Sequence, residues 1–273
     1  MALSVNTNVA ALSASNAASS VNRSMEASMN RLSTGMRINA ARDDSAGLAI
    51  ASRLTAEARG LDMAARNAAD GQALLDTVES AHAEVGAILQ RMRELAVQGA
   101  SDTNGTVDRE AIVTELDAMI AEIDSIAADT KWAGKDLISA ANTFVFQVGD
   151  EGDETITVTT SLVASTALSV DGTSSLTAAG EFTTFIDTVD SAIADIASYR
   201  ADYGAVSNRL DHVMSHLATN SESVKSSLGR IQDTDYAAET TNLAKDQILQ
   251  QAATSMLAQA NASKQTILSL IQG

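Results

Sequence analysis

Apolar residues recur along the chain at alternating steps of three and four positions, the spacing of one face of a helix. The clearest stripe consists of Leu74, Val78, Ala81, Val85, Ile88, Met92 and Leu95. After the turn-like sequence SDTNGTVD, a second consists of Ile112, Leu116, Met119, Ile123 and Ile126. A third consists of Ile186, Val189, Ile193, Ile196, Tyr203, Val206, Leu210, Val213, Leu217, Val224, Leu228 and Ile231. Three stripes that must be buried predict a mainly α fold, a long antiparallel helical bundle or coiled coil.

One region departs from helical spacing. Residues 144–159 read FVFQVGDEGDETITVT, in which β-branched and aromatic residues flank an acidic turn with glycine. This pattern predicts a small β-hairpin. The following residues, 160–184, are rich in Ser, Thr, Ala and Gly, and we interpret them as a short loop or linker.

The two ends of the chain are poor in large apolar residues. Burying the ten of them in residues 2–40 would contribute about 15–30 kcal/mol, whereas ordering about forty residues costs about 40–80 kcal/mol. Neither end should therefore be stable as a lone helix. Near the C-terminus, Leu249, Ala253, Met256, Ala260, Ile267 and Leu270 form an apolar stripe. This stripe could pack on the N-terminal one and on other chains. The predicted polymerisation seam consists of Val5, Val9, Leu12, Leu249, Met256, Ile267 and Leu270.

A charged break follows the first helical stretch, in LSTGMRINAARDDSAGLAIASRL at 32–54. A glycine can end a helix in the left-handed conformation, and an aspartate can accept hydrogen bonds from the free N–H groups of the next one. We interpret the break as an inter-domain joint made by Gly35, Arg37, Arg42, Asp43 and Asp44, with 36–42 non-helical. A capped turn with solvated charges is an equally simple interpretation.

Composition narrows the class of protein. The chain has no cysteine and no proline, where average usage would give about 14 prolines; proline breaks helices, so its absence suits long ones. The net charge of −17 argues against binding to nucleic acid or an anionic membrane. No apolar run approaches the ~20 residues of a membrane span. Because the first cation is Arg23, a conventional cleaved signal peptide is not expected.

Enzymatic patterns are weak. His212 and His216 have a metal-ligand spacing, but without a third ligand nearby, so a solvated helix face is the better interpretation. The carboxylates of residues 150–154 lack EF-hand spacing and suit a solvated turn. Nucleophile-elbow and phosphate-loop motifs are missing. We therefore expect no catalytic residues, no metal site and no cofactor.

Several motifs resemble bacterial flagellin. MNRLSTGMRINAARDDSAGLAIASRL at 29–54 is similar to the family's N-terminal signature, LQRMRELAVQ at 89–98 to its central helix, and FQVGDEGDETITV to its hairpin. Residues 204–261 resemble its C-terminal region almost throughout. The resemblance implies a structural, non-enzymatic subunit of the flagellar filament, the extracellular propeller of swimming bacteria.

The resemblance also implies a domain division. Residues 1–43 with 235–273 match an inner-tube coiled-coil domain, in which the terminal helices pair and which is disordered in the monomer but helical in the filament. Residues 44–234 match a bundle domain with a hairpin at about 144–159, and 160–184 form a short linker in place of outer domains. The proline that many relatives carry near the C-terminus is missing in NASKQTILSLIQG.

Partners follow from the same resemblance. They are other copies of the chain, a flagellar export chaperone, the type III export apparatus that secretes the unfolded subunit, and the filament cap and hook-associated proteins. Toll-like receptor 5 of vertebrates would recognise a surface with Arg91, Leu95 and Glu115 at the matching places. Two alternatives stay open: a hook–filament junction protein and a non-polymerising helical adaptor.

Overall fold

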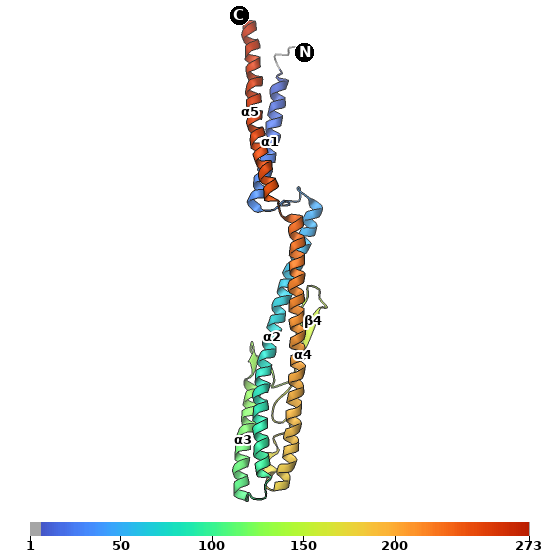
Figure 1. The fold of residues 1–273 in the computed structure, drawn as a ribbon, viewed down its shortest axis with the longest axis vertical. Coiled ribbons are helices and arrows are strands. Elements are labelled where there is room, and N and C mark those ends of the chain that lie inside the picture. The colour runs from blue at the N-terminus through green and yellow to red at the C-terminus, as the bar shows by residue number, and fades with distance from the viewer. Residues whose placement is uncertain (1–6, 273) are drawn as a thin grey trace. The chain divides into compact units, whose positions relative to one another are not determined.

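The chain is mainly α-helical. The computed structural model describes residues 7–272, with the backbone alone for Ser174 and residues 264–272. The helices are α1 (Val9–Thr34), α2 (Ser45–Gly99), α3 (Thr106–Asp129), α4 (Ala179–Gln232) and α5 (Tyr236–Gln272), as Figure 1 shows. The chain divides into two compact units, residues 57–222 and the remainder at both ends. Each unit is described by itself.

The larger unit is the predicted antiparallel bundle, which is confirmed. Its core is formed by the three stripes: Leu74, Val78, Val85, Met92 and Leu95 of α2, Ile112, Leu116 and Ile123 of α3, and Val189, Ile196, Tyr203 and Leu210 of α4 are all buried. At Gly99 the ring of Phe182 lies so close that an added Cβ would be 2.5 Å from it. Glycine therefore lets α4 approach the end of α2 closely.

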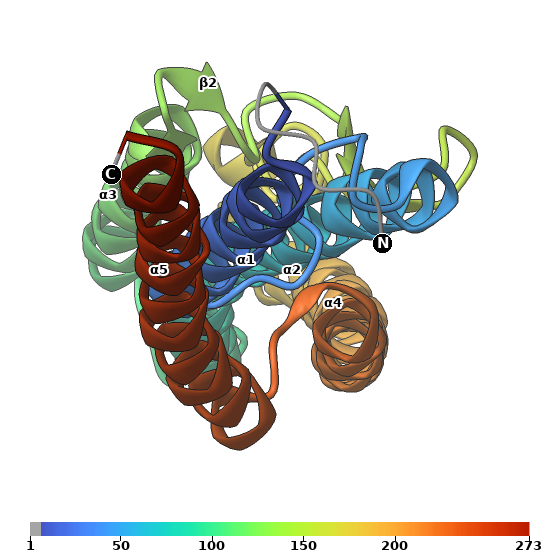
Figure 2. The ribbon, with the colours of Figure 1, turned by 90° about the horizontal axis from the view of Figure 1, so that it is seen from above.

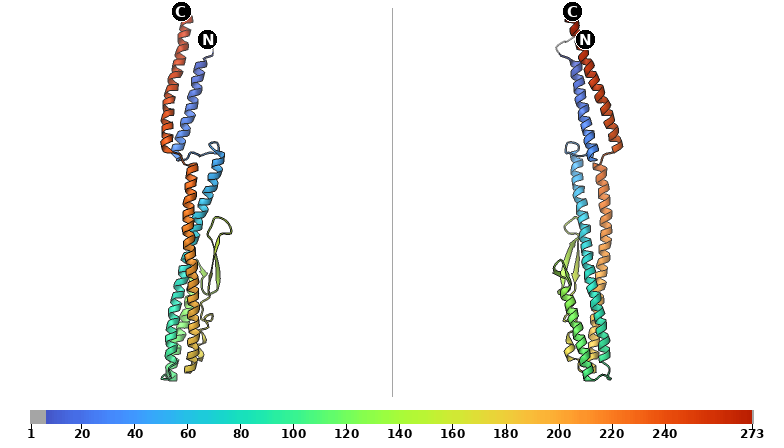
Figure 3. Two further views of the ribbon diagram at one scale, coloured as in Figure 1. Left: turned by 45° about the vertical axis from the view of Figure 1, so that its right-hand side comes forward. Right: turned by 90° about the vertical axis from the view of Figure 1, so that its left-hand side faces the viewer.

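The predicted hairpin is also confirmed. Strands β3 (Asn142–Gln147) and β4 (Thr155–Thr160) are antiparallel, with Phe144 opposite Val158 and Phe146 opposite Ile156. Along β4 the residues are alternately exposed and buried, because one face of the hairpin packs on the helices, beside which Figure 3 shows it. A second hairpin, β1 (Lys131–Trp132) with β2 (Lys135–Asp136), was not predicted.

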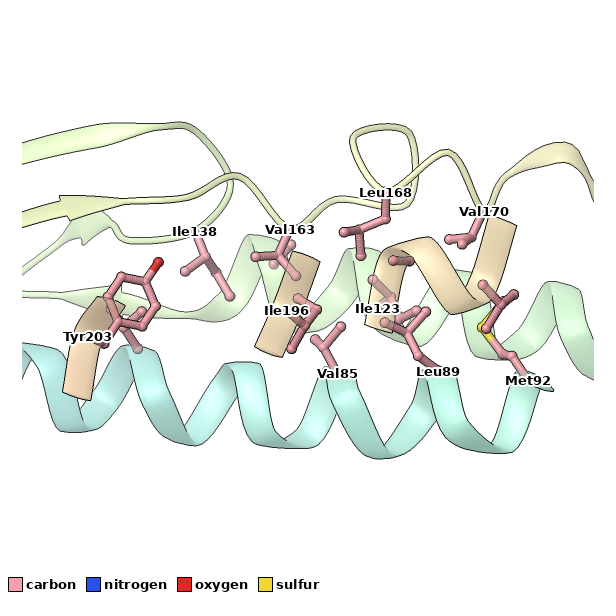
Figure 4. Close-up of a cluster of buried hydrophobic side chains, with 14 of the residues drawn as sticks. Val85, Leu89, Met92, Ile123, Ile138, Val163, Leu168, Val170, Ile196 and Tyr203 are labelled. Atoms are coloured by element: carbon pink, nitrogen blue, oxygen red, sulfur yellow. The ribbon is translucent and has the colours of Figure 1, made fainter. Parts of the chain in front are cut away.

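The segment after β4 is irregular, as predicted, but it is part of the core. Val163, Leu168, Val170 and Leu176 are each at most 5% exposed, around a 3-10 helix η1 (Gly172–Ser175). Figure 4 shows Val163, Leu168 and Val170 pointing toward Val85, Leu89 and Met92 of α2. The segment therefore closes one side of the bundle and does more than connect its elements.

None of the described helices has the length and the apolar character that crossing a membrane requires.

Candidate assembly site

The smaller unit contains the two terminal helices. Helices α1 and α5 lie side by side and antiparallel (Figures 1 and 2), so the predicted pairing is present. Its register is marked by two hydrogen bonds, from Asn8 Nδ2 to the Ala260 carbonyl at 3.1 Å and from Gln250 Nε2 to Asn22 Oδ1 at 2.8 Å. Near the other end of the pair, Arg31 and Glu239 are 3.7 Å apart.

The inner faces of the pair are small and polar. Along α1 the shielded positions, at steps of three and four, are Ala11, Ala14, Ala18, Val21, Met25, Ser28 and Leu32. Along α5 they are Glu239, Leu243, Asp246, Gln250, Ala253, Leu257 and Ala260. Both sets repeat every seven residues, as in a coiled coil. Because few of these side chains are large and apolar, the pair gains little hydrophobic stabilisation.

The expectation that the C-terminal stripe packs on the N-terminal one is wrong for its large residues. Leu249 and Met256 are 41% and 64% exposed, and Val9 and Leu12 are 66% and 58% exposed. The prediction considered apolar positions alone, whereas the inner face of α5 includes acidic and amide side chains. Val5 lies outside the described residues, as do the side chains of Ile267 and Leu270.

These exposed residues define a surface that we call the outer terminal surface. It consists of Val9, Leu12, Met29, Ile248, Leu249 and Met256. Large apolar side chains that a helix pair leaves exposed are candidates for burial against a protein partner.

Two breaks in the helices lie together at the predicted joint. Gly35 ends α1 with φ of 73° and donates its N–H to the Arg31 carbonyl at 2.8 Å. Its own carbonyl accepts from the Thr234 N–H, and the Arg37 N–H donates to the Gln232 carbonyl at 2.7 Å. This second half, between α4 and α5, was not predicted, although the polar stretch QDTD at 232–235 indicates a break there.

The two aspartates of the joint have separate roles. Asp44 accepts from the Gly47 N–H at 2.8 Å and so caps α2. Asp43 accepts from the N–H groups of Ala40 and Asn39 at 3.0 and 3.2 Å, and these bonds hold its pKa below the ordinary value. Arg42 is an exposed neighbour, 3.8 Å from Asp43.

The predicted receptor surface is only partly exposed. Arg91 donates to Glu94 at 2.9 Å and to Glu115 at 3.2 Å, and both bonds raise its pKa. Leu95, in contrast, is 3% exposed, which corrects the prediction that it belongs to this surface. It lies on the apolar stripe of α2, so the bundle core takes up its side chain.

The structure also reveals a buried histidine that the sequence analysis missed. His82 is 0% exposed; its Nδ1 lies 2.8 Å from the Val78 carbonyl and its Nε2 3.5 Å from the Tyr203 hydroxyl. That hydroxyl accepts from the Ser161 N–H at 3.0 Å. Burial lowers the pKa of His82. The histidines that were considered, His212 and His216, are exposed, and the described residues hold no cluster suited to a metal ion.

Comparisons with known proteins point to one family. Residues 5–143 match the model of the bacterial flagellin N-terminal helical region, and residues 186–271 match that of the C-terminal helical region. Flagellin of Bacillus subtilis (strain 168) is 36% identical over 98% of this chain and 99% of that protein.

Two further similarities concern length and fold. Flagellin D of Vibrio cholerae is 32% identical over 377 aligned positions, which include 99% of this chain and all of that protein. Since this chain has 273 residues, that relative carries residues that this chain lacks. The structure of a candidate flagellar hook-associated protein from Vibrio parahaemolyticus, 19% identical, has a TM-score of 0.58 over 70% of this chain and 100% of that one, a likeness of fold alone.

Proposed function

Because the chain belongs to the bacterial flagellin family, we propose that its outer terminal surface is where identical subunits join. Flagellins are the structural subunits of the flagellar filament, and this chain is such a subunit, a homopolymer former that serves motility. The family is a structural one rather than a family of enzymes, and its filament is extracellular.

The observation that carries the proposal is the mismatch between the two faces of the terminal helix pair. The inner face is mostly alanine and polar residues, while Val9, Leu12 and Met256 point to solvent. Covering these exposed residues with a neighbouring copy would supply the hydrophobic stabilisation that the pair lacks. Assembly and ordering of the ends would then be one process.

Substitution of Met256 tests this surface. Met256→Ser should raise the critical concentration for assembly about tenfold or more, because burial of a methionine contributes about 1.5–3 kcal/mol at every repeated contact. Thermal unfolding of the monomer should hardly change. Met256→Leu, which keeps the apolar surface, is the matched control and should assemble normally.

Removal of Thr266–Gly273, or Leu270→Ala, should likewise give a folded monomer that assembles poorly. Sedimentation and electron microscopy measure assembly, and calorimetry measures the monomer. Normal filaments from Met256→Ser and from the truncated chain would overturn the proposal. A wild-type chain that never forms filaments would favour the non-polymerising adaptor instead.

The same proposal assigns different roles to different segments of the chain. We infer that residues 1–43 with 235–273 form the polymerisation domain and that 44–234 form the bundle domain, with 160–184 in place of outer domains. The hydrogen bonds from Thr234 to Gly35 and from Arg37 to Gln232 support a joint between them. Arg42, Asp43 and Asp44 complete this joint at the start of α2.

We further propose that the subunit is secreted unfolded through the type III export apparatus, with an export chaperone, and is then added beneath the filament cap on a base of hook-associated proteins. The absence of cysteine and proline supports this, because neither disulfide exchange nor prolyl isomerisation would delay folding after export. No observation on this chain favours a hook–filament junction protein over a flagellin.

Recognition by Toll-like receptor 5 is proposed for the surface of Arg91 and Glu115. Arg91→Ala should weaken receptor signalling by the monomer, because it removes an exposed guanidinium, and arginine often dominates interfaces. Arg93→Ala is the matched control, since Arg93 is similarly exposed but pairs with Asp190 of α4. Equal signalling by the two variants, both correctly folded, would contradict the assignment.

A further inference from the structure

The apolar contacts between α1 and α5 do not by themselves specify how the two helices align. Their inner faces repeat every seven residues and are rich in alanine, and such faces can pack almost equally well after a shift of one heptad. Apolar contacts alone would therefore not decide which turn of α1 lies against which turn of α5. Polar groups at single core positions are known to specify register, at some cost in stability.

Glu239 is the less exposed of the two buried carboxylates on this interface, the other being Asp246 at 8% exposed. It lies in the first turn of α5 and is 6% exposed, and its Oε1 is buried without a hydrogen bond. A buried carboxylate is costly unless a compensating charge lies beside it. The compensating charge is the Arg31 guanidinium at 3.7 Å, whose side chain is 37% exposed.

The position of the pair makes it sensitive to register. A shift of one heptad along the helix axis moves Arg31 about 10 Å away from Glu239. The carboxylate would then remain buried against α1 without its cation, whereas the exposed arginine would simply be hydrated. The hydrogen bond between Asn22 and Gln250 would be broken by the same shift, so the two contacts favour one register.

We propose that Arg31 and Glu239 set the register of α1 against α5, and that only this register presents the outer terminal surface correctly to the next subunit. The inference rests on the proposed assembly through the terminal helices. It assigns Arg31 and Glu239 as positioning residues, acting through the helices rather than by contact with the neighbouring copy.

Removal of each charge in turn, with a polar side chain left in its place, tests the pairing. Arg31→Gln should raise the critical concentration for assembly about tenfold, because it leaves the buried carboxylate uncompensated. Glu239→Gln should have a smaller effect, since the remaining arginine reaches water. Arg31→Gln combined with Glu239→Gln should assemble better than Arg31→Gln alone, because the carboxylate that has lost its cation is then removed as well. Arg23→Gln, at an exposed position of the same helix, is the control and should match the wild type.

Register itself can be read by cross-linking, because the chain has no cysteine of its own. In filaments, Ala18→Cys with Ala253→Cys should form a disulfide, and Ala18→Cys with Ala260→Cys, one heptad along, should not. The same cysteine pairs are then placed in the Arg31→Gln variant, at concentrations where it assembles. There the disulfide yield of the second pair should rise and that of the first should fall. The inference would be overturned if the effects of Arg31→Gln and Glu239→Gln on the free energy of assembly simply added in the double variant. An unchanged cross-linking pattern in Arg31→Gln would also overturn it. Failure of the wild type to assemble would instead overturn the proposed function.

Discussion

His82 shows how a single polar residue is accommodated in a helical core. Its ring lies edge-on to those of Tyr199 and Tyr203, with centroids 6.2 and 5.1 Å away. The Ser161 N–H, the Tyr203 hydroxyl and the imidazole connect the segment after β4 to α4 and α2. If Nδ1 donates to the Val78 carbonyl, Nε2 is free to accept from Tyr203, so the neutral ring fits this site and the charged ring does not.

Acid should therefore destabilise the bundle through His82. Its pKa in the fold is lowered, chiefly by burial and also by Arg200, against the opposing influence of the Val78 carbonyl and Glu79. Between this pKa and the ordinary value near 6.5, only the unfolded chain binds the proton, so the free energy of unfolding falls as pH drops below about 6.5.

His82→Leu should flatten the dependence of the melting temperature on pH between about 7 and 5, whatever its effect on stability at pH 8. His216→Gln, at an exposed position, is the control and should keep the wild-type slope. Carboxylates whose pKa is lowered, such as Asp190 beside Arg93, contribute at lower pH. A wild-type slope in His82→Leu would contradict this account.

At the scale of elements, the segment from Ser161 to Ala178 illustrates burial without periodicity. Its apolar residues are spaced irregularly among small polar ones, so neither a helical nor a strand pattern marks them as core. Two carboxylates of α3 hold the backbone in place: Asp124 accepts from the N–H and the hydroxyl of Ser165, at 2.8 and 2.9 Å, and Asp117 accepts from the Thr173 hydroxyl. The core position of the segment thus depends on groups far away in the sequence.

The terminal helices should be the least stable elements of the isolated subunit. Of the side chains described in α1, only Ser28 is buried, so local opening should cost little free energy. Limited proteolysis of the monomer should remove about forty residues from each end and leave a core that includes residues 57–222. Mass spectrometry identifies the cut sites, and the same digestion of filaments should spare the ends. Strong protection of terminal amides from hydrogen exchange in a confirmed monomer would contradict the prediction.

At the scale of the whole molecule, charge opposes assembly. Each subunit carries a net charge of −17, so copies repel one another at long range. Salt screens this repulsion, because the screening length falls from about 30 Å at 0.01 M to about 10 Å at 0.1 M. The critical concentration should therefore fall several-fold between 0.01 and 0.15 M NaCl. Sedimentation at fixed protein concentration measures this change, with sucrose of equal osmolarity as the control. A critical concentration that rises with salt would indicate that ion pairs between subunits outweigh the repulsion.

The sequence by itself determined the long helices and the larger hairpin of this protein. The stripes of α2, α3 and α4, the alternation in β4 and the helix end at Gly35 follow from backbone geometry and from neighbours a few residues apart, and the structure contains them all. Flagellin motifs within those elements determined the family.

Only the tertiary structure decided which faces meet. It turned Glu239 and Gln250 of α5 toward α1 while leaving Met256 in solvent, and it brought Ser161 to Tyr203 beside His82. The physical reason is that periodicity specifies where an element buries a face, whereas the choice of partner depends on groups that are distant in the sequence. A polar side chain in particular can be buried only where folding supplies its charge or hydrogen-bond partner.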